Sequence, residues 1–213
     1  MKSITFFGGT GGLGSQIVPH LDKYKVEAIG SRTVDFSNPT EISSYFETNK
    51  EVDAVVIFTN YNFNSFLHKY QHNHEELQKQ ININILGVTS CIASALESMR
   101  ARGGGRIILA SSVTVDRNVM GTSIYAATKA YYENLVKTIA IENASKGITA
   151  NCLQLGYMDG GLTYTLPESF IEETINNIPA KRLGKPSEIA NAIEFLIETE
   201  YVNGATINLT GGL

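Results

Sequence analysis

A tyrosine and a lysine four residues apart, Tyr125 and Lys129 in the stretch YAATK, are the first candidates for chemistry in this sequence. In an expected helix they share one face, because residues four apart lie about one turn above each other. A phenol with a pKa of about 10 is a poor proton donor or acceptor near neutrality, and a neighbouring ammonium group lowers that pKa. We therefore expect Lys129 to lower the pKa of Tyr125, and Tyr125 to act as a general acid or base.

A serine, Ser112, ends the apolar run RIILASS and stands thirteen positions before Tyr125. The carboxyl end of a buried parallel strand is where open α/β sheets bind ligands. The Ser112 hydroxyl could there hydrogen-bond a substrate oxygen as negative charge develops on it. Its neighbour Ser111 should point the other way, since side chains alternate along a strand.

The glycine-rich stretch FFGGTGGLGS follows the first apolar run and precedes a helical one. It can be read as Gly8-x-x-x-Gly12-x-Gly14 or as Gly9-x-Gly11-x-x-Gly14. Bare backbone amides and the positive end of a helix dipole bind a pyrophosphate at such a turn. We therefore predict a dinucleotide site here.

The adenosine end of that dinucleotide should lie at the next strand end, in GSRTVDFSN. Arg32 follows the strand directly, where a guanidinium could bind a 2'-phosphate, so NADP(H) is favoured. Asp35 stands about twenty residues past Gly14 and could instead bind a free 2'-hydroxyl. NAD(H) therefore stays open as the alternative.

Short apolar runs alternate with amphipathic segments of helical length along the whole chain. The expected strands are 4–7, 26–30, 54–58, 106–110, 149–155 and 205–209. The expected helices are 13–24, 39–49, 74–100, 125–144 and 187–198. This alternation predicts one domain over 1–213, with a parallel sheet covered by helices on both faces. Only SRTVDFSN separates the second strand from the next helix, so we expect six strands, with one edge strand missing or vestigial.

Composition limits the partners of this chain. A net charge of −4 and scattered basic residues argue against a nucleic-acid surface, and no apolar run approaches the roughly 18 residues of a membrane span. Cys91 and Cys152 lie in apolar segments and no leader precedes the first strand, which indicates a reduced, cytoplasmic protein. The histidines His68, His72 and His74 lack acidic or cysteine partners, so no metal site is expected.

Taken together in their order, several motifs resemble the short-chain dehydrogenase/reductase family over nearly the whole chain. They are GGTGGLG, NINILGV, RIILASSV, YAATK, GITANCLQLG, KRLGKPSEIANAIEFL and NGATINLTGG. The resemblance implies a Rossmann-like, doubly wound α/β fold. It places the catalytic roles on Asn84, Ser112, Tyr125 and Lys129, with Asn84 holding a water that links Lys129 to solvent.

The resemblance also implies an NADP(H)-dependent oxidoreductase that transfers a hydride between nicotinamide and a carbonyl or secondary alcohol of a small molecule. The expected cofactor contacts are Gly8, Thr10, Gly11, Gly12, Leu13, Gly14, Ser31, Arg32, Asp35, Phe36, Thr59, Asn60, Tyr125, Lys129, Gly156 and Met158. Two alternatives stay open: a catalytically silent nucleotide-binding regulatory or scaffold subunit, and a sugar-nucleotide epimerase or dehydratase that uses the cofactor transiently.

The chain departs from the family pattern at three strand ends. Phe7 replaces a threonine, residues 57–60 replace Asn-Asn-Ala-Gly, and Leu155 replaces the proline of Pro-Gly. Because Phe7 and Phe58 should end neighbouring strands, we expect an apolar contact between them in place of a polar one.

Two further expectations follow from the resemblance. Residues 156–184 occupy the position of a substrate lid, with Tyr157, Asp159, Leu162 and Tyr164 as candidate substrate contacts. The long helices 74–100 and 125–144 would join copies of the chain into a homo-oligomer, a dimer or tetramer.

Overall fold

A single six-stranded parallel sheet forms the centre of the computed structural model, which describes all 213 residues. The strand order is β2-β1-β3-β4-β5-β6. The strands are β1 (Ser3–Phe7), β2 (Lys25–Ile29), β3 (Ala54–Ile57), β4 (Gly105–Ser112), β5 (Ile148–Leu155) and β6 (Thr206–Leu209). The predicted doubly wound α/β fold is confirmed, and β2 lies at the edge because no further strand follows it on that side.

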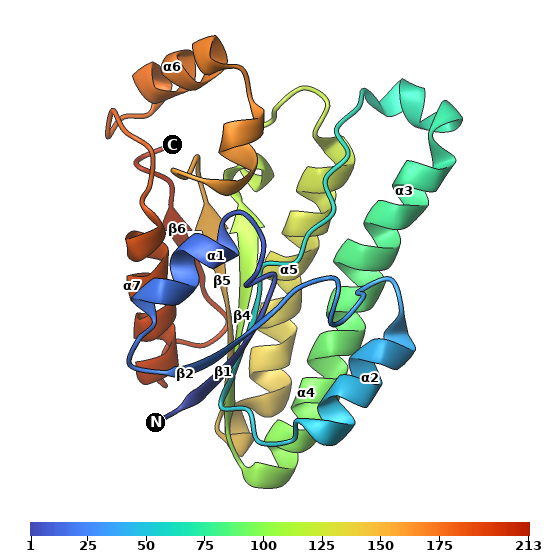
Figure 1. Ribbon diagram of the computed structural model, residues 1–213, viewed down its shortest axis with the longest axis vertical. Coiled ribbons are helices and arrows are strands. Elements are labelled where there is room, and N and C mark those ends of the chain that lie inside the picture. The colour runs from blue at the N-terminus through green and yellow to red at the C-terminus, as the bar shows by residue number, and fades with distance from the viewer.

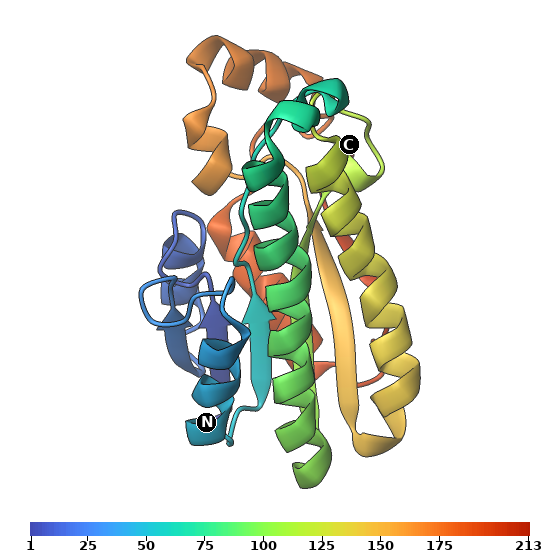
Figure 2. The same ribbon diagram turned by 90° about the vertical axis from the view of Figure 1, so that its right-hand side faces the viewer.

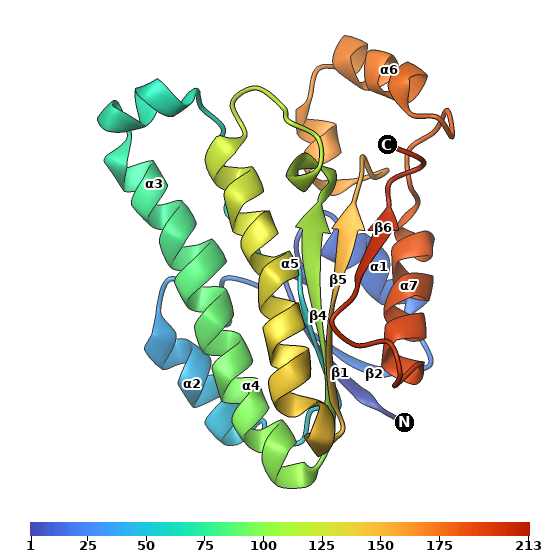
Figure 3. The same ribbon diagram turned by 180° about the vertical axis from the view of Figure 1, so that it is seen from behind.

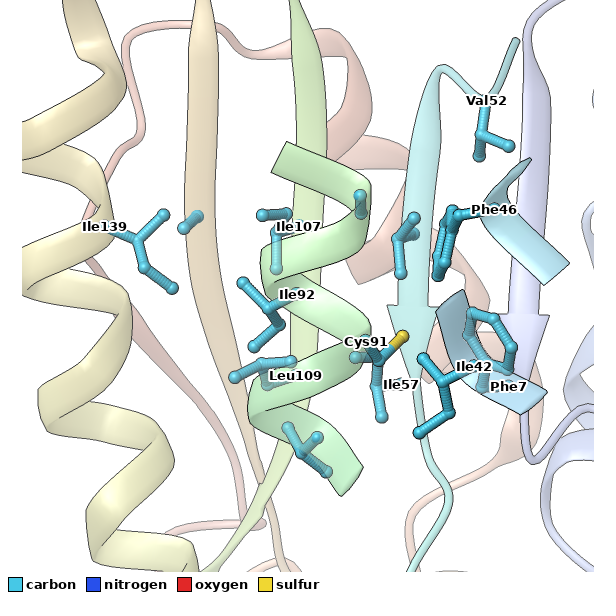
Figure 4. Close-up of a cluster of buried hydrophobic side chains, with 14 of the residues drawn as sticks. Phe7, Ile42, Phe46, Val52, Ile57, Cys91, Ile92, Ile107, Leu109 and Ile139 are labelled. Carbon is cyan, nitrogen blue, oxygen red and sulfur yellow. The ribbon is translucent and has the colours of Figure 1, made fainter. Parts of the chain in front are cut away.

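One face of the sheet packs against three helices, α2 (Pro39–Thr48), α4 (Val88–Arg102) and α5 (Ser123–Asn143). Figure 4 shows Ile107 and Leu109 of β4 pointing toward Ile92 of α4, with Ile139 of α5 beside them. Each such buried aliphatic side chain contributes about 1.5 to 3 kcal/mol by leaving water.

The opposite face of the sheet is covered by α1 (Gly14–Ile17) and α7 (Pro186–Glu198), as Figures 1 and 3 show. Ile108 lies between Ile107 and Leu109 in the chain but packs on this side, because side chains alternate across a strand. Every residue of β4 and β5 is buried, as expected for central parallel strands.

The first helix is much shorter than the expected 13–24. Helix α1 ends at Ile17 and a 3-10 turn, Val18–His20, follows it. Pro19 lies in that turn, where its missing N–H ends the α-helical hydrogen bonding. A helix of one turn supplies only a small dipole, so the predicted dinucleotide site at the glycine turn would depend on backbone amides rather than on the dipole.

The helix expected over 74–100 is continuous but changes its hydrogen-bonding pattern. It consists of α3 (His74–Ile81), a π-helical turn (Asn82–Gly87) and α4. The whole run, His74–Arg102, is long and apolar enough to cross a membrane by composition alone. One third of its most apolar window is buried inside the protein, which includes the face of α4 that packs on the sheet. Gly103, with φ of 79°, ends α4.

Beyond β5 the chain leaves the sheet and forms a separate segment above the strand ends (Figures 1 and 2). It contains a 3-10 turn (Gly161–Thr165) and α6 (Glu168–Asn177). Its two ends are tied together, because Asp159 donates its N–H to the Gly184 carbonyl at 2.7 Å and Gly184 donates to Tyr157 at 3.0 Å. We call residues 160–183, the part of the expected 156–184 lid that lies between these two bonds, the lid segment. Other 3-10 turns are Leu67–His72, Val113–Val115 and Ala144–Lys146.

Candidate functional site

A cleft of about 660 Å³ opens at the carboxyl ends of the central strands, between the glycine turn, the Ser112 end of β4 and the lid segment. β1 and β3 are neighbours although the chain passes through β2 between them, so this is the switch point where such sheets bind ligands. Fifteen of the sequence-predicted site residues line the cleft: Gly8, Thr10, Gly11, Gly12, Leu13, Gly14, Ser31, Thr59, Asn60, Ser112, Tyr125, Lys129, Gly156, Met158 and Leu162.

Seven predicted residues do not line the cleft: Arg32, Asp35, Phe36, Asn84, Tyr157, Asp159 and Tyr164. Nine lining residues were not predicted: Gly30, Phe58, Ala110, Ser111, Leu155, Gly160, Gly161, Thr163 and Thr165. The glycine pair Gly160–Gly161 was the one visible signal among these, since adjacent glycines in a lid indicate a close backbone approach.

The glycine turn has two kinds of glycine. Gly8, with φ of 85°, lies against the next strand end, because a Cβ there would stand 2.7 Å from the Thr59 nitrogen. A Cβ on Gly14 would stand 2.1 Å from the Gly8 carbonyl oxygen. Gly11 and Gly12 are exposed instead, and both line the cleft.

Free amides make this turn a suitable cradle for a phosphate. The backbone N–H groups of Thr10, Gly12 and Leu13 donate no hydrogen bond within the protein. Backbone amides with bare glycine beside them suit a pyrophosphate. The side-chain oxygen of Asn60 is also buried in the cleft without a partner, so it could accept a hydrogen bond from a ligand hydroxyl. The residues present therefore fit a dinucleotide.

At the expected adenosine end of the cleft, the two candidate recognition residues, Arg32 and Asp35, differ in whether their side chains already have partners in the protein. Arg32 is exposed and its guanidinium has no hydrogen bond or ion pair, and its neighbour Ser31 lines the cleft. Asp35 accepts hydrogen bonds from both the N–H and the hydroxyl of Ser37, each at 2.8 Å, and so lies in a local turn outside the cleft. Phe36 belongs to the buried core, with its ring 5.2 Å from that of Phe7.

Ser112 keeps its own proton available for a ligand. Its oxygen accepts a hydrogen bond from the Thr114 N–H at 3.2 Å and another from the Thr114 hydroxyl at 3.0 Å. With those acceptor positions filled, the Ser112 O–H can donate, either to the neighbouring Tyr125 oxygen or to a ligand oxygen. Ser111 points to a different partner, donating to the Glu133 carboxylate of α5. The two hydroxyls diverge, as strand alternation predicts.

Lys129 is almost completely buried, with 3% of its surface exposed. Its ammonium donates to the Ala110 carbonyl at 2.9 Å and lies 4.7 Å from the centre of the Tyr132 ring and 5.5 Å from that of Tyr125. Burial lowers the pKa of Lys129 to about 7, because a low-dielectric surrounding disfavours the charged form.

Burial also raises the pKa of Tyr125, and the neighbouring Ser112 hydroxyl opposes this by favouring the phenolate. The prediction that Lys129 lowers the pKa of Tyr125 is wrong for the protein without ligand. The physical reason is that desolvation acts on both groups and favours their neutral forms.

Asn84 makes two side-chain hydrogen bonds with the backbone of a single residue, Tyr61. It is fully buried in the π-helical turn, where its side-chain oxygen accepts from the Tyr61 N–H at 2.8 Å and its amide donates to the Tyr61 carbonyl at 2.7 Å. These two bonds fasten the loop that begins with Thr59 and Asn60. The side chain therefore supports the cleft wall from behind, and its predicted role in holding a water near Lys129 stays a prediction.

Phe7 and Phe58 stand at two of the strand ends where the chain departs from the family pattern. Their backbones are hydrogen-bonded, but their side chains pack on opposite faces of the sheet. Phe58 donates its N–H to the Phe7 carbonyl at 2.8 Å, so the expected proximity of the two strands is confirmed. The expected contact between the Phe7 and Phe58 rings is wrong, because Phe58 packs on Phe6 at 5.0 Å on the opposite face. Gly156 makes its close approach to the Thr210 backbone, where a Cβ would stand 2.9 Å away.

The lid segment reaches across the cleft to the glycine turn. A Cβ on Gly12 would stand 3.3 Å from the Gly161 Cα, and one on Gly161 would stand 2.9 Å from the Leu13 Cβ. Among the expected lid contacts, only Leu162 lines the cleft. Asp159 instead accepts a hydrogen bond from the Tyr164 hydroxyl at 2.6 Å, which raises the pKa of Tyr164. Tyr157 faces a smaller cavity behind the lid segment.

A family model described as enoyl-(acyl carrier protein) reductase matches residues 14–213. The chain belongs to the short-chain dehydrogenase/reductase family. A solved structure of a short chain dehydrogenase/reductase family protein superimposes with a TM-score of 0.86 at 22% identity, covering 99% of this chain and 96% of that one.

Two kinds of curated relative are similar to this member of the family. Acetoacetyl-CoA reductase of Allochromatium vinosum is 37% identical over 135 residues, which are 62% of this chain and 55% of that protein. The 3-oxoacyl-[acyl-carrier-protein] reductase MabA of Mycobacterium bovis is 28% identical over 230 aligned positions, covering 100% of this chain and 92% of that protein. This chain thus spans just over half the length of the acetoacetyl-CoA reductases it matches.

Proposed function

We propose that this protein is an NADP(H)-dependent oxidoreductase that reduces the carbonyl of a small molecule, or oxidises the corresponding secondary alcohol. The observation that carries the proposal is the single cleft that joins the glycine turn, with its free amides, to Ser112, Tyr125 and Lys129. Relatives named acetoacetyl-CoA reductase and 3-oxoacyl-[acyl-carrier-protein] reductase make a 3-oxoacyl thioester the first substrate class to try.

Tyr125 is suited to act as the proton donor in the reduction. Its raised pKa keeps the phenol protonated at neutral pH, which is the form that gives a proton to the substrate oxygen. The free O–H of Ser112 hydrogen-bonds the same oxygen as negative charge develops. Bound nicotinamide supplies the hydride in reduction and accepts it in oxidation.

Lys129 acts on the nucleotide and on Tyr125. Its ammonium is the buried cation closest to Tyr125, and it would bind a ribose hydroxyl when the dinucleotide occupies the cleft. When Lys129 is protonated, its positive charge favours the phenolate left after proton transfer. The amides of Thr10, Gly12 and Leu13 would hold the pyrophosphate.

A difference between the Arg32 and Asp35 side chains supports a preference for NADP(H) over NAD(H). The Arg32 guanidinium has no partner in the protein, whereas one oxygen of the Asp35 carboxylate, Oδ1, already accepts two hydrogen bonds from Ser37. A free guanidinium at this strand end suits a 2'-phosphate, and a carboxylate held in a local turn by Ser37 is less free to reach a ribose hydroxyl.

We also propose that the protein works in the cytoplasm as a homo-oligomer. Leu86 and Ile141, on the helical face that includes α4 and α5, are 51% and 83% exposed, and an interface would cover them. Light scattering of the eluted protein would show a dimer or larger assembly, and a monomer at working concentration would contradict this.

Fluorescence titration with NADPH and NADH tests the proposed function through the Arg32→Ala variant. We expect NADPH to bind more tightly than NADH, and the variant to lose about tenfold in NADPH affinity with NADH affinity unchanged. Arg117→Ala is the matched control, because Arg117 is exposed, unpaired and outside the cleft. Absence of binding by either nucleotide would contradict the proposed enzyme.

A further inference from the structure

Gln154 places one side-chain amide between two carboxylates beside the cleft. It lies on β5, is 2% exposed, and does not line the cleft. Its nitrogen donates to an Asp116 oxygen at 2.9 Å and to a Glu133 oxygen at 3.2 Å. Ser111, which pairs with Gln154 in the sheet register, donates its hydroxyl to the same Glu133 oxygen.

These bonds connect the elements that carry the three reactive side chains. Asp116 closes the 3-10 turn that begins at Ser112, since its N–H donates to the Val113 carbonyl at 3.2 Å. Glu133 lies on α5, two helical turns beyond Tyr125, and faces the sheet together with Lys129. Gln154 therefore joins the turn that orients Ser112 to the helix that carries Tyr125.

Packing alone does not explain a glutamine at this position. A buried amide loses its hydrogen bonds to water, and an apolar side chain of the same size would fill the space without that cost. Both acceptors are carboxylates, which repel one another when they share one donor. Without the Gln154 amide the exposed Asp116 has no partner in the protein and is free to turn toward solvent, loosening the turn that holds Ser112.

We propose that Gln154 is a positioning residue for the reaction, which sets the placement of Ser112 relative to Tyr125 through Asp116 and Glu133. It touches neither the substrate nor the cofactor site. This inference rests on the proposed function, because Ser112 and Tyr125 are taken as the groups that hold and protonate the substrate oxygen.

Gln154→Met tests the proposal, with Asn151→Leu as the matched control. Both are fully or almost fully buried amides on β5, but Asn151 donates to Val202 at 2.8 Å and accepts from Ala205 at 2.9 Å, away from α5. We expect Gln154→Met to lower kcat about tenfold with KM for NADPH unchanged, since the reacting groups are misaligned while the nucleotide site is intact. The control should lose stability with its kcat unaltered.

Hydrogen exchange gives a second readout that does not need turnover. The amides of residues 113–117 should exchange faster in Gln154→Met than in wild type, and in Asn151→Leu they should not. Asp116→Ala changes an exposed residue, so it will fold, and it should reproduce both effects.

The outcomes separate the two claims. Unchanged kcat and unchanged exchange at 113–117 in Gln154→Met and Asp116→Ala would overturn the positioning role. Equal kcat losses in Gln154→Met and Asn151→Leu would overturn it as well, since general destabilisation would then explain both. If the wild-type protein turns over no carbonyl substrate, the proposed function fails, and the exchange measurement still decides whether Gln154 orders the Ser112 turn.

Discussion

The Lys129 ammonium donates its hydrogen bond to the Ala110 carbonyl, 2.9 Å away, inside the protein and next to the Ser111–Ser112 strand end. A charged amine in this position is held by one backbone oxygen and the faces of two tyrosine rings. No carboxylate forms an ion pair with it. Burying the charged form of Lys129 therefore lowers the stability of the folded protein. Because the charge depends on protonation, the free energy of unfolding depends on pH.

Lys129→Met should stabilise the protein most at low pH. In the folded state the pKa of Lys129 is lowered to about 7 from 10.5, so between these values the unfolded chain binds more protons and wild-type stability rises with pH. The advantage of the variant in free energy of unfolding should shrink by roughly 3 to 5 kcal/mol between about pH 6.5 and pH 10. Urea unfolding of both proteins across this range measures it, and parallel pH curves would count against a buried, titrating Lys129.

Thr114→Val should lower kcat without weakening NADPH binding. The variant keeps the size of the side chain and the backbone N–H but loses the hydroxyl that donates to Ser112. Ser112 could then turn its own proton toward another acceptor, and its hydrogen bond to the substrate oxygen would weaken. We expect roughly a tenfold loss in kcat, less than for Ser112→Ala. Steady-state kinetics of both variants decides this, and equal kcat for Thr114→Val and wild type would refute it.

The two kinds of glycine in the turn should respond differently to alanine. Gly8→Ala imposes a positive φ on alanine and places Cβ against the Thr59 nitrogen, so it should cost about 2 kcal/mol or more in folding stability. Gly11→Ala meets only the Gly8 oxygen at 3.2 Å and should fold, but lose about tenfold in NADPH affinity because Cβ covers the cradle. Thermal unfolding and fluorescence titration measure both, and equal affinity in Gly11→Ala and wild type would be the contrary result.

Gly161→Ala should displace the lid segment from the glycine turn. Gly161 has φ of 58°, and a Cβ there would stand 2.9 Å from the Leu13 Cβ. We expect faster limited proteolysis within residues 160–183. Gly104→Ala is the control, because its Cβ would meet only the Gly147 oxygen at 3.7 Å. Equal cleavage rates in the Gly161 variant and the control would show that the lid segment does not depend on this contact.

The sheet and the cluster of reactive residues could be predicted from sequence because local signals determine both. Six apolar runs predicted the six strands, and the short connection after the second run predicted that one edge strand is missing. Ser112 ends a central strand, and Tyr125 and Lys129 share one helical face. The fold therefore brings the three residues together at the carboxyl ends of the central strands.

Side-chain partners and pKa values could not be predicted, because they depend on contacts between distant segments. No local sequence signal shows that Asn84 binds the Tyr61 backbone or that Ser37 donates hydrogen bonds to Asp35. Nor does the sequence show that burial raises the pKa of Tyr125 despite the nearby Lys129. The expected first helix, 13–24, is too long because Pro19 lies in a 3-10 turn and ends the α-helical hydrogen bonding after Ile17.

The central claim is that Tyr125 protonates a carbonyl oxygen while NADPH is bound in the same cleft. Single-turnover oxidation of bound NADPH by acetoacetyl-CoA, followed by absorbance in wild type and Tyr125→Phe, tests it most directly. We predict rapid oxidation by wild type, and a loss of about a thousandfold or more in Tyr125→Phe with NADPH affinity unchanged, since the phenol is the only proton donor assigned to the reaction. Comparable oxidation rates in the two proteins would contradict the account.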